Sequence, residues 1–393
     1  NVELYGDKSL IEYTKKFDNV ELNNLKVSSE KINNSDNDID KDLKESINAA
    51  FDNIYKFHKN QVIDFNKIET TPGVLCWQEK RAIENVGLYI PGGTAPLFSS
   101  VLMLAIPAMI AKCKNIVLCS PPDKNGELHP AILYCAKLCK VDTVICVGGA
   151  QSIAAMSIGT DTVPKVNKIF GPGNQFVTYA KLKSINFNTA IDMPAGPSEL
   201  LVLADKYANP SYIASDLLSQ AEHGPDSQVI FVSLSKSLIN EVEKCINDQV
   251  KSLDRIDFIN KSISNSKLVF FDDKTKAIDF INLYAPEHYI INVQDESFFI
   301  DNIVSAGSVF IGNYTPESAG DYASGTNHTL PTNGNAKQYS GVNLDSFQKT
   351  ITFQKISKTG LLNISKTVET MAEAEGLQAH KNAVSIRVKD LNN

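Results

Sequence analysis

The chain has 393 residues, of which 43% are apolar and 21% are charged, a composition typical of a folded globular protein rather than a disordered one. Its 38 basic and 45 acidic side chains give a formal net charge of −7, which argues against a nucleic-acid binder, because such proteins carry a clustered basic excess. At this length we expect two domains and a core large enough to fold without disulfides or a structural metal.

Residues 1–40 are polar and rich in asparagine, and they show no basic region followed by an apolar core, so a secretory signal is not indicated. The absence of an initiator methionine at Asn1 leaves room for a segment that precedes this numbering. An amphipathic helix is predicted from about Lys41. Its apolar face consists of Leu43, Ile47, Phe51, Ile54 and Phe57.

The longest apolar stretch, Leu97–Ala111, is interrupted by Ser99, Ser100 and Pro107. It is too short and too broken to cross a bilayer, so it predicts a buried helix and no membrane association. The 7 cysteines form no C-x-x-C pair, and most lie within apolar helix or strand patterns. We expect reduced, buried thiols and therefore a cytoplasmic protein.

After Pro72, short β-rich runs alternate with helical patterns, which is typical of βαβ units and a mainly parallel sheet. The runs are too many for one comfortable sheet, so we expect two α/β domains. The predicted strands are Ile83–Ile90, Asn115–Cys119, Thr143–Val147, Val166–Phe170, Leu200–Leu203, Val229–Ser233, Lys267–Phe271, Tyr289–Val293 and Ser308–Ile311.

The chain beyond the last predicted strand changes character. Gly312–Leu344 is rich in Gly, Asn, Thr and Ser and shows no periodicity, which is typical of a functional or disordered loop. The C-terminal segment is again helical in pattern. Its apolar positions are Leu361, Ile364, Val368, Met371 and Leu377.

Three glycine-rich turns follow predicted strands and precede predicted helices. They are Pro91-Gly92-Gly93, Gly148-Gly149-Ala150-Gln151 and Gly171-Pro172-Gly173-Asn174. Ligands of parallel sheets bind beyond the carboxyl ends of the strands, where the amides at a helix start can hold a phosphate. None of the turns is the G-x-G-x-x-G fingerprint, because Phe176 stands at the last glycine position. Alone, they are weak evidence for a dinucleotide, since such turns use glycine for geometric reasons.

Two pairs of residues near predicted helix and strand ends are candidates for chemistry. Gln220 and His223 lie three residues apart near the end of a predicted helix, so they share one face and can bind one ion. A histidine that interacts with the helix dipole explains the spacing equally well. Glu287 and His288 precede a predicted strand, where the imidazole can act as a general base and the carboxylate can activate water. An exposed loop pair is an even alternative.

The remaining candidate ligands are dispersed along the chain, and no local pattern resembles a zinc finger. They are Asp321 and His328 in the aperiodic stretch, and Glu375 and His380 in the C-terminal segment. If they converge, a site of Gln220, His223, Asp321 and His380 would suit Zn²⁺, with Mn²⁺ as a competitor. Sequence spacing does not show convergence. The other histidines, His58 and His129, are predicted to be surface residues.

Several ordered stretches together carry a family resemblance. They are Val86-Gly87-Leu88-Tyr89-Ile90-Pro91-Gly92-Gly93, Gly171-Pro172-Gly173-Asn174, Asp192-Met193-Pro194-Ala195-Gly196-Pro197-Ser198-Glu199, Ser219-Gln220-Ala221-Glu222-His223-Gly224-Pro225-Asp226-Ser227, Ala285-Pro286-Glu287-His288, Ala319-Gly320-Asp321-Tyr322, Gly325-Thr326-Asn327-His328 and Glu375-Gly376-Leu377-Gln378-Ala379-His380. Through them the chain resembles the histidinol dehydrogenase family. Residues 1–60 carry no comparable motif.

The resemblance implies an oxidoreductase of amino-acid biosynthesis that oxidises L-histidinol through L-histidinaldehyde to L-histidine, the last step of histidine biosynthesis, in two NAD⁺-dependent steps. It implies one Zn²⁺ per subunit, which anchors the imidazole and amine of the substrate as a template. His288 would be the base in both oxidations, and Glu287 would activate the water that hydrates the aldehyde.

The resemblance also assigns binding residues. The implied Zn²⁺ ligands are Gln220, His223, Asp321 and His380. The implied substrate-binding residues are Ser198, Gln220, His223, His288, Asp321, His328, Glu375 and His380. The implied NAD-binding residues are Tyr89, Gln151 and Asn174, one from each glycine-rich turn.

The implied fold is α/β, with two incomplete Rossmann-like parallel-sheet domains, a helical N-terminal arm and a helical C-terminal tail. We expect residues 1–88 with 199–342 to form the first domain, which carries the metal and the Glu-His pair, and residues 89–198 to form the NAD domain. Residues 343–393 would be the tail and would reach the partner subunit of an intertwined homodimer with shared active sites.

Two alternatives stay open at this point. A related zinc- and NAD-dependent dehydrogenase of another small amino- or sulfo-alcohol could keep the zinc and the Glu-His pair, although Ser198, His328 and Glu375 favour histidinol. In a different class, a zinc hydrolase could use Glu287 and a metal-bound water without NAD. Formation of NADH from histidinol and NAD⁺ separates these alternatives.

Overall fold

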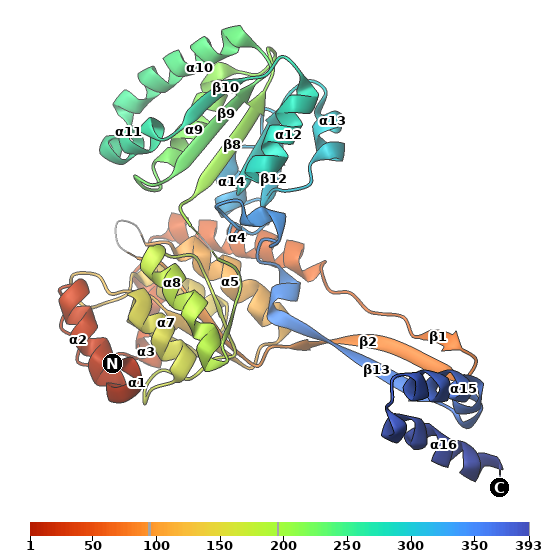
Figure 1. The fold of residues 1–393 in the computed structure, drawn as a ribbon. Coiled ribbons are helices and arrows are strands. Elements are labelled where there is room, and N and C mark those ends of the chain that lie inside the picture. Colours follow the sequence, from red (N-terminus) through yellow and green to blue (C-terminus); the bar gives the residue numbers. More distant parts are fainter. Residues whose placement is uncertain (93–95, 195, 393) are drawn as a thin grey trace. The chain divides into compact units, whose positions relative to one another are not determined.

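The computed structural model describes residues 1–92, 96–194 and 196–392, and the chain divides into two compact units (Figure 1). The main unit consists of Asn1–Gln61 and Ile83–Phe347, and the C-terminal unit of Val62–Ala82 and Gln348–Asn393. Gly93 of the first glycine-rich turn and Ala195 of a family motif lie outside the described residues.

The main unit contains a first five-stranded parallel sheet with the strand order β5-β4-β3-β6-β7. Its strands are β3 (Asn85–Tyr89), β4 (Asn115–Cys119), β5 (Thr143–Ile145), β6 (Lys168–Phe170) and β7 (Ala190–Ile191). Its helices are α5 (Phe98–Ala111), α6 (Pro130–Leu138), α7 (Gly149–Ile158), α8 (Gln175–Ser184) and the 3₁₀ turn η2 (Ile185–Phe187). The strand order reverses between β3 and β6, which is where open α/β sheets bind ligands at the carboxyl edge.

A second five-stranded parallel sheet repeats this topology with the order β10-β9-β8-β11-β12. Its strands are β8 (Glu199–Ala204), β9 (Gln228–Ser233), β10 (Lys267–Phe270), β11 (His288–Asn292) and β12 (Ser308–Ile311). Its helices are α9 (Pro210–Ala221), α10 (Lys236–Gln249), η3 (Val250–Ser252), α11 (Ile256–Ser264), α12 (Lys274–Tyr284), α13 (Glu296–Asn302) and α14 (Glu317–Tyr322), followed by η4 (Asn335–Lys337) and η5 (Leu344–Phe347). The two incomplete Rossmann-like sheets and every predicted strand are thus confirmed.

The inner strands of both sheets are buried on both faces, which is why they read as continuous apolar runs. In β8, Leu200 and Val202 belong to one hydrophobic cluster, whereas Leu201 and Leu203 belong to another. Successive side chains of a strand point to opposite faces, so each sheet separates two cores. The predicted buried helix is α5, whose residues are almost all inaccessible to solvent. Within the described residues, no helix is long and apolar enough to cross a membrane.

The N-terminal arm is helical, as predicted. It contains α1 (Val2–Tyr5), α2 (Asp7–Phe17), α3 (Ser29–Asn34), η1 (Ser35–Asn37) and α4 (Lys41–Lys59). Helix α4 begins where Asp40 accepts a hydrogen bond from the Leu43 amide at 2.8 Å, and it buries Ile47 and Ile54 in the core of the first sheet. The domain division that groups residues 1–88 with 199–342 remains a prediction.

The C-terminal unit combines a small antiparallel sheet with the helical tail. Its elements are β1 (Ile68–Thr71), β2 (Val74–Ala82), β13 (Gln348–Ile356), α15 (Lys358–Ala374) and α16 (Gln378–Asn392). The helices were predicted, but the sheet was not. Strand β13 pairs with β2, and Phe353 stacks on Trp77 with ring centroids 5.4 Å apart. The pairing joins segments that are far apart in sequence, so no local sequence pattern predicts it.

Candidate functional site

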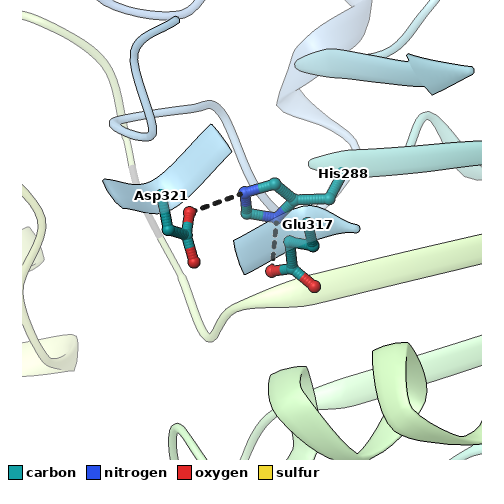
Figure 2. Close-up of side chains that lie close together, drawn as sticks. All are labelled: His288, Glu317 and Asp321. Carbon is teal, nitrogen blue, oxygen red and sulfur yellow. Dashed lines mark ion pairs between the residues drawn. The ribbon is translucent and has the colours of Figure 1, made fainter. Parts of the chain in front are cut away.

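A buried group at the start of β11 is the centre of the candidate site. Among the described residues, His288, Glu317 and Asp321 are the histidine and carboxylate side chains close enough to share a metal ion, with ligand atoms all within 4.8 Å of one another (Figure 2). His288 Nδ1 lies 3.4 Å from Glu317 Oε1, and His288 Nε2 lies 3.8 Å from Asp321 Oδ1. Glu317 and Asp321 are four residues apart on α14, so both carboxylates lie on one face of that helix.

The imidazole of His288 has one satisfied and one unsatisfied nitrogen. Its Nδ1 lies 3.1 Å from the backbone carbonyl oxygen of Glu199, which can only accept a hydrogen bond, so the proton of the neutral ring is on Nδ1. Its Nε2 is buried and has no hydrogen-bond partner among the described residues. The ring therefore presents a lone pair on Nε2 toward the side of Asp321.

Two further glutamates support the start of β11. Glu287 Oε2 accepts a hydrogen bond from the Glu199 amide at 2.8 Å, and Glu199 Oε1 accepts one from the Asn333 amide at 2.9 Å. Because β8 and β11 are neighbouring parallel strands, the first of these bonds joins their amino ends, and the second ties the start of β8 to the loop at Asn333. The site therefore lies at the amino edge of the second sheet, whereas the predicted location of ligand sites was the carboxyl edge.

Burial dominates the electrostatics of these side chains. It raises the pKa of Glu199 to about 7 and raises the pKa values of Glu287 and Glu317 well above the ordinary value of a glutamate. It lowers the pKa of His288 to about 4, although the Asp321 carboxylate acts in the opposite direction. His288 is thus a neutral imidazole at neutral pH, as a proton acceptor must be.

Gln220 reaches the same group from α9, where it is fully buried. With its amide nitrogen turned toward α14, it donates to both carboxylate oxygens of Glu317, one of them at 3.2 Å. This orientation directs the amide oxygen of Gln220 away from Glu317 and leaves it available as a ligand. Asp216, one turn earlier on α9, is a further acidic neighbour that raises the pKa of Glu317.

His328 is a second histidine beside Asp321, with its Nδ1 3.8 Å from the same carboxylate oxygen, Oδ1. Its Nδ1 is 3.0 Å from the backbone oxygen of Asp321, and its Nε2 is 3.2 Å from Ser100 Oγ on α5. Burial lowers its pKa, and so does a charge on His223, which is exposed just beyond the end of α9. Gln220, Asp321, His288 and His328 therefore gather around the amino end of β11 and α14. The prediction that Gln220 and His223 share one helical face is wrong, because α9 ends at Ala221 and His223 lies beyond it.

The other predicted site residues are placed differently. Ser198 directly precedes β8, beside Glu199. Glu375 and His380 are exposed residues of the C-terminal unit. The prediction that His58 is a surface residue is wrong. It is fully buried on α4, and its Nδ1 lies 2.9 Å from the Ile54 backbone oxygen, because it lies on the buried face of this helix.

The predicted cofactor residues lie at the carboxyl edge of the first sheet. Tyr89 ends β3, and its hydroxyl accepts a hydrogen bond from the Gly149 amide at 3.3 Å. A Cβ built on Gly173 would lie 3.3 Å from Tyr89 Cε1, so the same ring also lies beside the turn that follows β6. A Cβ on Gly149 would lie 2.6 Å from Gln151 Oε1. The structure thus brings two of the glycine-rich turns together around Tyr89.

The helices that start at these turns differ in capping. Asn174 caps α8, because its Oδ1 accepts from the amides of Phe176 at 3.0 Å and Val177 at 3.1 Å. The N-cap residue of α7 is Gly148, which offers no side chain for capping. The Gly149 amide binds Tyr89, and the amides that follow it in the first turn of α7 receive no side-chain cap from Gly148, so they suit an anionic group such as a phosphate.

Two residues of the site were not identified from the sequence. Glu199 ends one of the family motifs, which implies no role for it, and Glu317 lies outside all of them. A signal for Glu317 exists in its spacing of four from Asp321, which places both on one helical face once α14 is recognised.

Comparisons with known proteins agree with one another. The family model described as histidinol dehydrogenase matches residues 1–388. The chain is 54% identical over 386 residues to the histidinol dehydrogenase of Bacteroides fragilis, covering 98% of this chain and 90% of that protein. It is 54% identical over 389 residues to a chloroplastic histidinol dehydrogenase of Arabidopsis thaliana, covering 98% and 83%. The crystal structure of histidinol dehydrogenase from Elizabethkingia anophelis matches with a TM-score of 0.97 at 54% identity, covering 100% of this chain and 90% of that one.

Proposed function

Because the chain belongs to the histidinol dehydrogenase family, we propose that His288 is the base for both oxidations of histidinol and that the residues around it hold Zn²⁺ and the substrate. Membership of the family makes the protein an oxidoreductase of histidine biosynthesis that acts on histidinol. The observation that carries the proposal is the unpartnered, buried Nε2 of His288 beside Asp321.

His288 is suited to accept the proton of the substrate alcohol. The Glu199 carbonyl holds the ring proton on Nδ1, so Nε2 can take a proton without a change of tautomer. Burial keeps the ring neutral and excludes water from the base. A positioned base of this kind contributes about 10²–10⁴-fold to a rate.

Glu287 would serve the second oxidation, in which the aldehyde must first be hydrated. One of its oxygens is held by the Glu199 amide, and the same oxygen lies 3.7 Å from His288 Nδ1. The side chain is thus fixed next to the base but does not occupy Nε2. We assign Glu287 to activation of the attacking water and His288 to the proton transfers of both steps.

The donor set fits Zn²⁺, since it combines two imidazoles, a carboxylate and an amide oxygen. Gln220, His223, Asp321 and His380 would hold the ion, with Glu317 orienting the Gln220 amide. These residues would hold the ion where it would supply a template for the polar groups of histidinol. His328, Ser198 and Glu375 would contact the remaining polar groups of the substrate, with His328 oriented by Asp321 and Ser100.

The glycine-rich turns of the first sheet fit a dinucleotide. The glycines allow the close approach of Tyr89 to both turns, and the amides at the start of α7 suit a phosphate. Tyr89, Gln151 and Asn174 would hold NAD⁺, which takes up the hydride in each oxidation.

His380 and Glu375 belong to the C-terminal unit, which exposes Ile68, Met371 and Ile386. A partner that covered these side chains would remove their apolar surface from water. We propose a homodimer in which this unit completes the site of the other subunit.

We assign the protein to the cytoplasm because all cysteines are free thiols.

The test is a spectrophotometric assay for NADH after addition of histidinol and NAD⁺ to the purified protein. Two NADH should form per histidinol. Treatment with a chelator should abolish turnover and leave the circular dichroism spectrum unchanged, because the large α/β core folds without metal. Full turnover in a metal-free sample, or hydrolysis without NADH, would refute the proposal.

A further inference from the structure

We propose that the buried ion pair of Lys181 and Asp192 holds the turn Gly171–Asn174 in the shape that binds the cofactor, so that both are positioning residues for NAD⁺. This inference rests on the proposed dinucleotide site at the carboxyl edge of the first sheet. Neither residue touches the reacting atoms in the proposed mechanism.

Both side chains form hydrogen bonds with the backbone of Gly171. Lys181 Nζ lies 2.5 Å from Asp192 Oδ1, and the side chains are only 2% and 1% exposed. Lys181 Nζ donates to the Gly171 carbonyl oxygen at 2.7 Å, and Asp192 Oδ2 accepts from the Gly171 amide at 2.8 Å. The peptide groups on both sides of Gly171 are therefore fixed by opposite charges.

Stability alone does not explain this arrangement. Removing two charges from water costs several kcal/mol per ion, and well-packed apolar residues of similar volume are often at least as stabilising as a buried ion pair. An apolar pair could not, however, bind the amide and the carbonyl of Gly171. The feature that requires charged groups here is the backbone conformation of the turn.

That conformation determines how the turn meets Tyr89. Gly171 has φ +117°, and a Cβ at this position would lie 2.1 Å from the Tyr89 backbone oxygen, so the backbone passes against the end of β3. Two residues later, Gly173 lies beside the Tyr89 ring. A rotation of the peptides at Gly171 would move the turn away from Tyr89.

The ion pair also connects the turn to the helix that follows it. Lys181 belongs to α8, whose N-cap is Asn174, and Asp192 follows β7. The pair thus links three consecutive segments of the fold: the turn after β6, helix α8 and the segment after β7. Its loss would release the start of α8 and with it Asn174, one of the proposed cofactor residues.

The test measures two binding equilibria. Binding of NADH is monitored by the fluorescence of NADH, and binding of Zn²⁺ is measured separately. The double variant Lys181→Met/Asp192→Asn leaves no unpaired charge in the core and should fold. We expect its Kd for NADH to rise about 10- to 100-fold, as for a displaced binding element. The Zn²⁺ affinity and kcat at saturating NAD⁺ should stay within about twofold of the wild type, because none of the proposed metal and base residues belongs to the first sheet or its helices.

The matched control is Lys165→Met, which removes another lysine of the same α/β half whose ammonium also binds a backbone carbonyl. Lys165 Nζ donates to the Phe187 backbone oxygen at 2.9 Å and not to the turn, so its loss should leave the Kd for NADH unchanged. Unchanged NADH binding in the double variant would overturn the inference and leave the proposed function intact. Absence of NADH binding by the wild type would overturn both.

A second measurement needs no variant. In the cofactor-free wild type, the amides of Gly171 and Met193, which both donate to Asp192, should be strongly protected from hydrogen exchange. Rapid exchange of the Gly171 amide would show that the turn is not held by the pair and would refute the inference, whatever the stability of the double variant.

Discussion

The Nδ1 atom of His288 lies 3.1 Å from the backbone carbonyl oxygen of Glu199, and this bond joins the amino ends of β11 and β8. The bond places the proposed base at a fixed point of the sheet and selects the tautomer that leaves Nε2 free. The Glu199 amide in turn binds Glu287. One residue of β8 therefore orients both members of the Glu-His pair through its backbone.

The first prediction separates the roles of these two neighbours. His288→Asn should slow oxidation of both histidinol and histidinaldehyde by about 10²–10⁴-fold, because both need the base. Glu287→Gln should slow oxidation of the aldehyde far more than that of the alcohol, since only the aldehyde requires activated water. Single-turnover formation of NADH from each substrate measures the two losses. Equal losses in Glu287→Gln would contradict the division of labour.

The second prediction concerns Glu317 as the residue that orients Gln220. Glu317→Gln should weaken Zn²⁺ binding by about 10- to 100-fold, the usual effect of removing a partner of a metal ligand. Competition with a chromophoric chelator measures the affinity. Asp216→Asn is the control, because it removes a neighbouring acidic group while the Glu317 carboxylate remains. An equal effect of both variants would indicate that negative charge, rather than orientation of Gln220, is responsible.

The third prediction is a dependence of stability on pH through Glu199. Burial raises its pKa from 4.5 to about 7, so the folded state keeps a proton that the unfolded state has lost across this interval. This residue should therefore reduce the free energy of unfolding as pH rises from 4.5 to 7, by about 3 kcal/mol in total, with no further change above pH 7.

Urea unfolding of Glu199→Gln between pH 4.5 and 8 checks this expectation. The variant should lose less stability than the wild type over the interval, since glutamine keeps an acceptor for the Asn333 amide and does not ionise. Glu243→Gln, an exposed position on α10, serves as the control and should follow the wild type. Parallel curves for Glu199→Gln and wild type would contradict the prediction.

The fourth prediction tests the shared active site. Two inactive variants, His288→Asn and His380→Asn, are unfolded together and refolded as mixed dimers. If His380 binds the Zn²⁺ of the other subunit, one site of each mixed dimer receives both intact residues. Random pairing makes half of the dimers mixed, so activity should return to roughly a quarter of the wild type. Mixed dimers that form but stay inactive would show that His380 serves its own subunit.

The sequence alone determined the two parallel sheets. Their strands are buried on both faces and therefore appear as short apolar runs, such as Leu200–Leu203, between helical patterns, and this signal is local. The family motifs likewise identified the residue types of the site, because the chemistry of an imidazole or a carboxylate is carried by the side chain itself. The motifs that contain His288 and Asp321 are recognisable without the fold.

Tertiary structure alone decided which of these residues meet and in what environment. From the dipeptide alone, Glu287-His288 had an even chance of being an exposed loop, and only the pairing of β11 with β8 buries it against Glu199. Glu317 acquires its role because α14 packs on α9, and β13 becomes a strand because β2 is its partner. Such contacts join residues remote in sequence, and their free energy depends on burial and hydrogen bonding that no local pattern encodes.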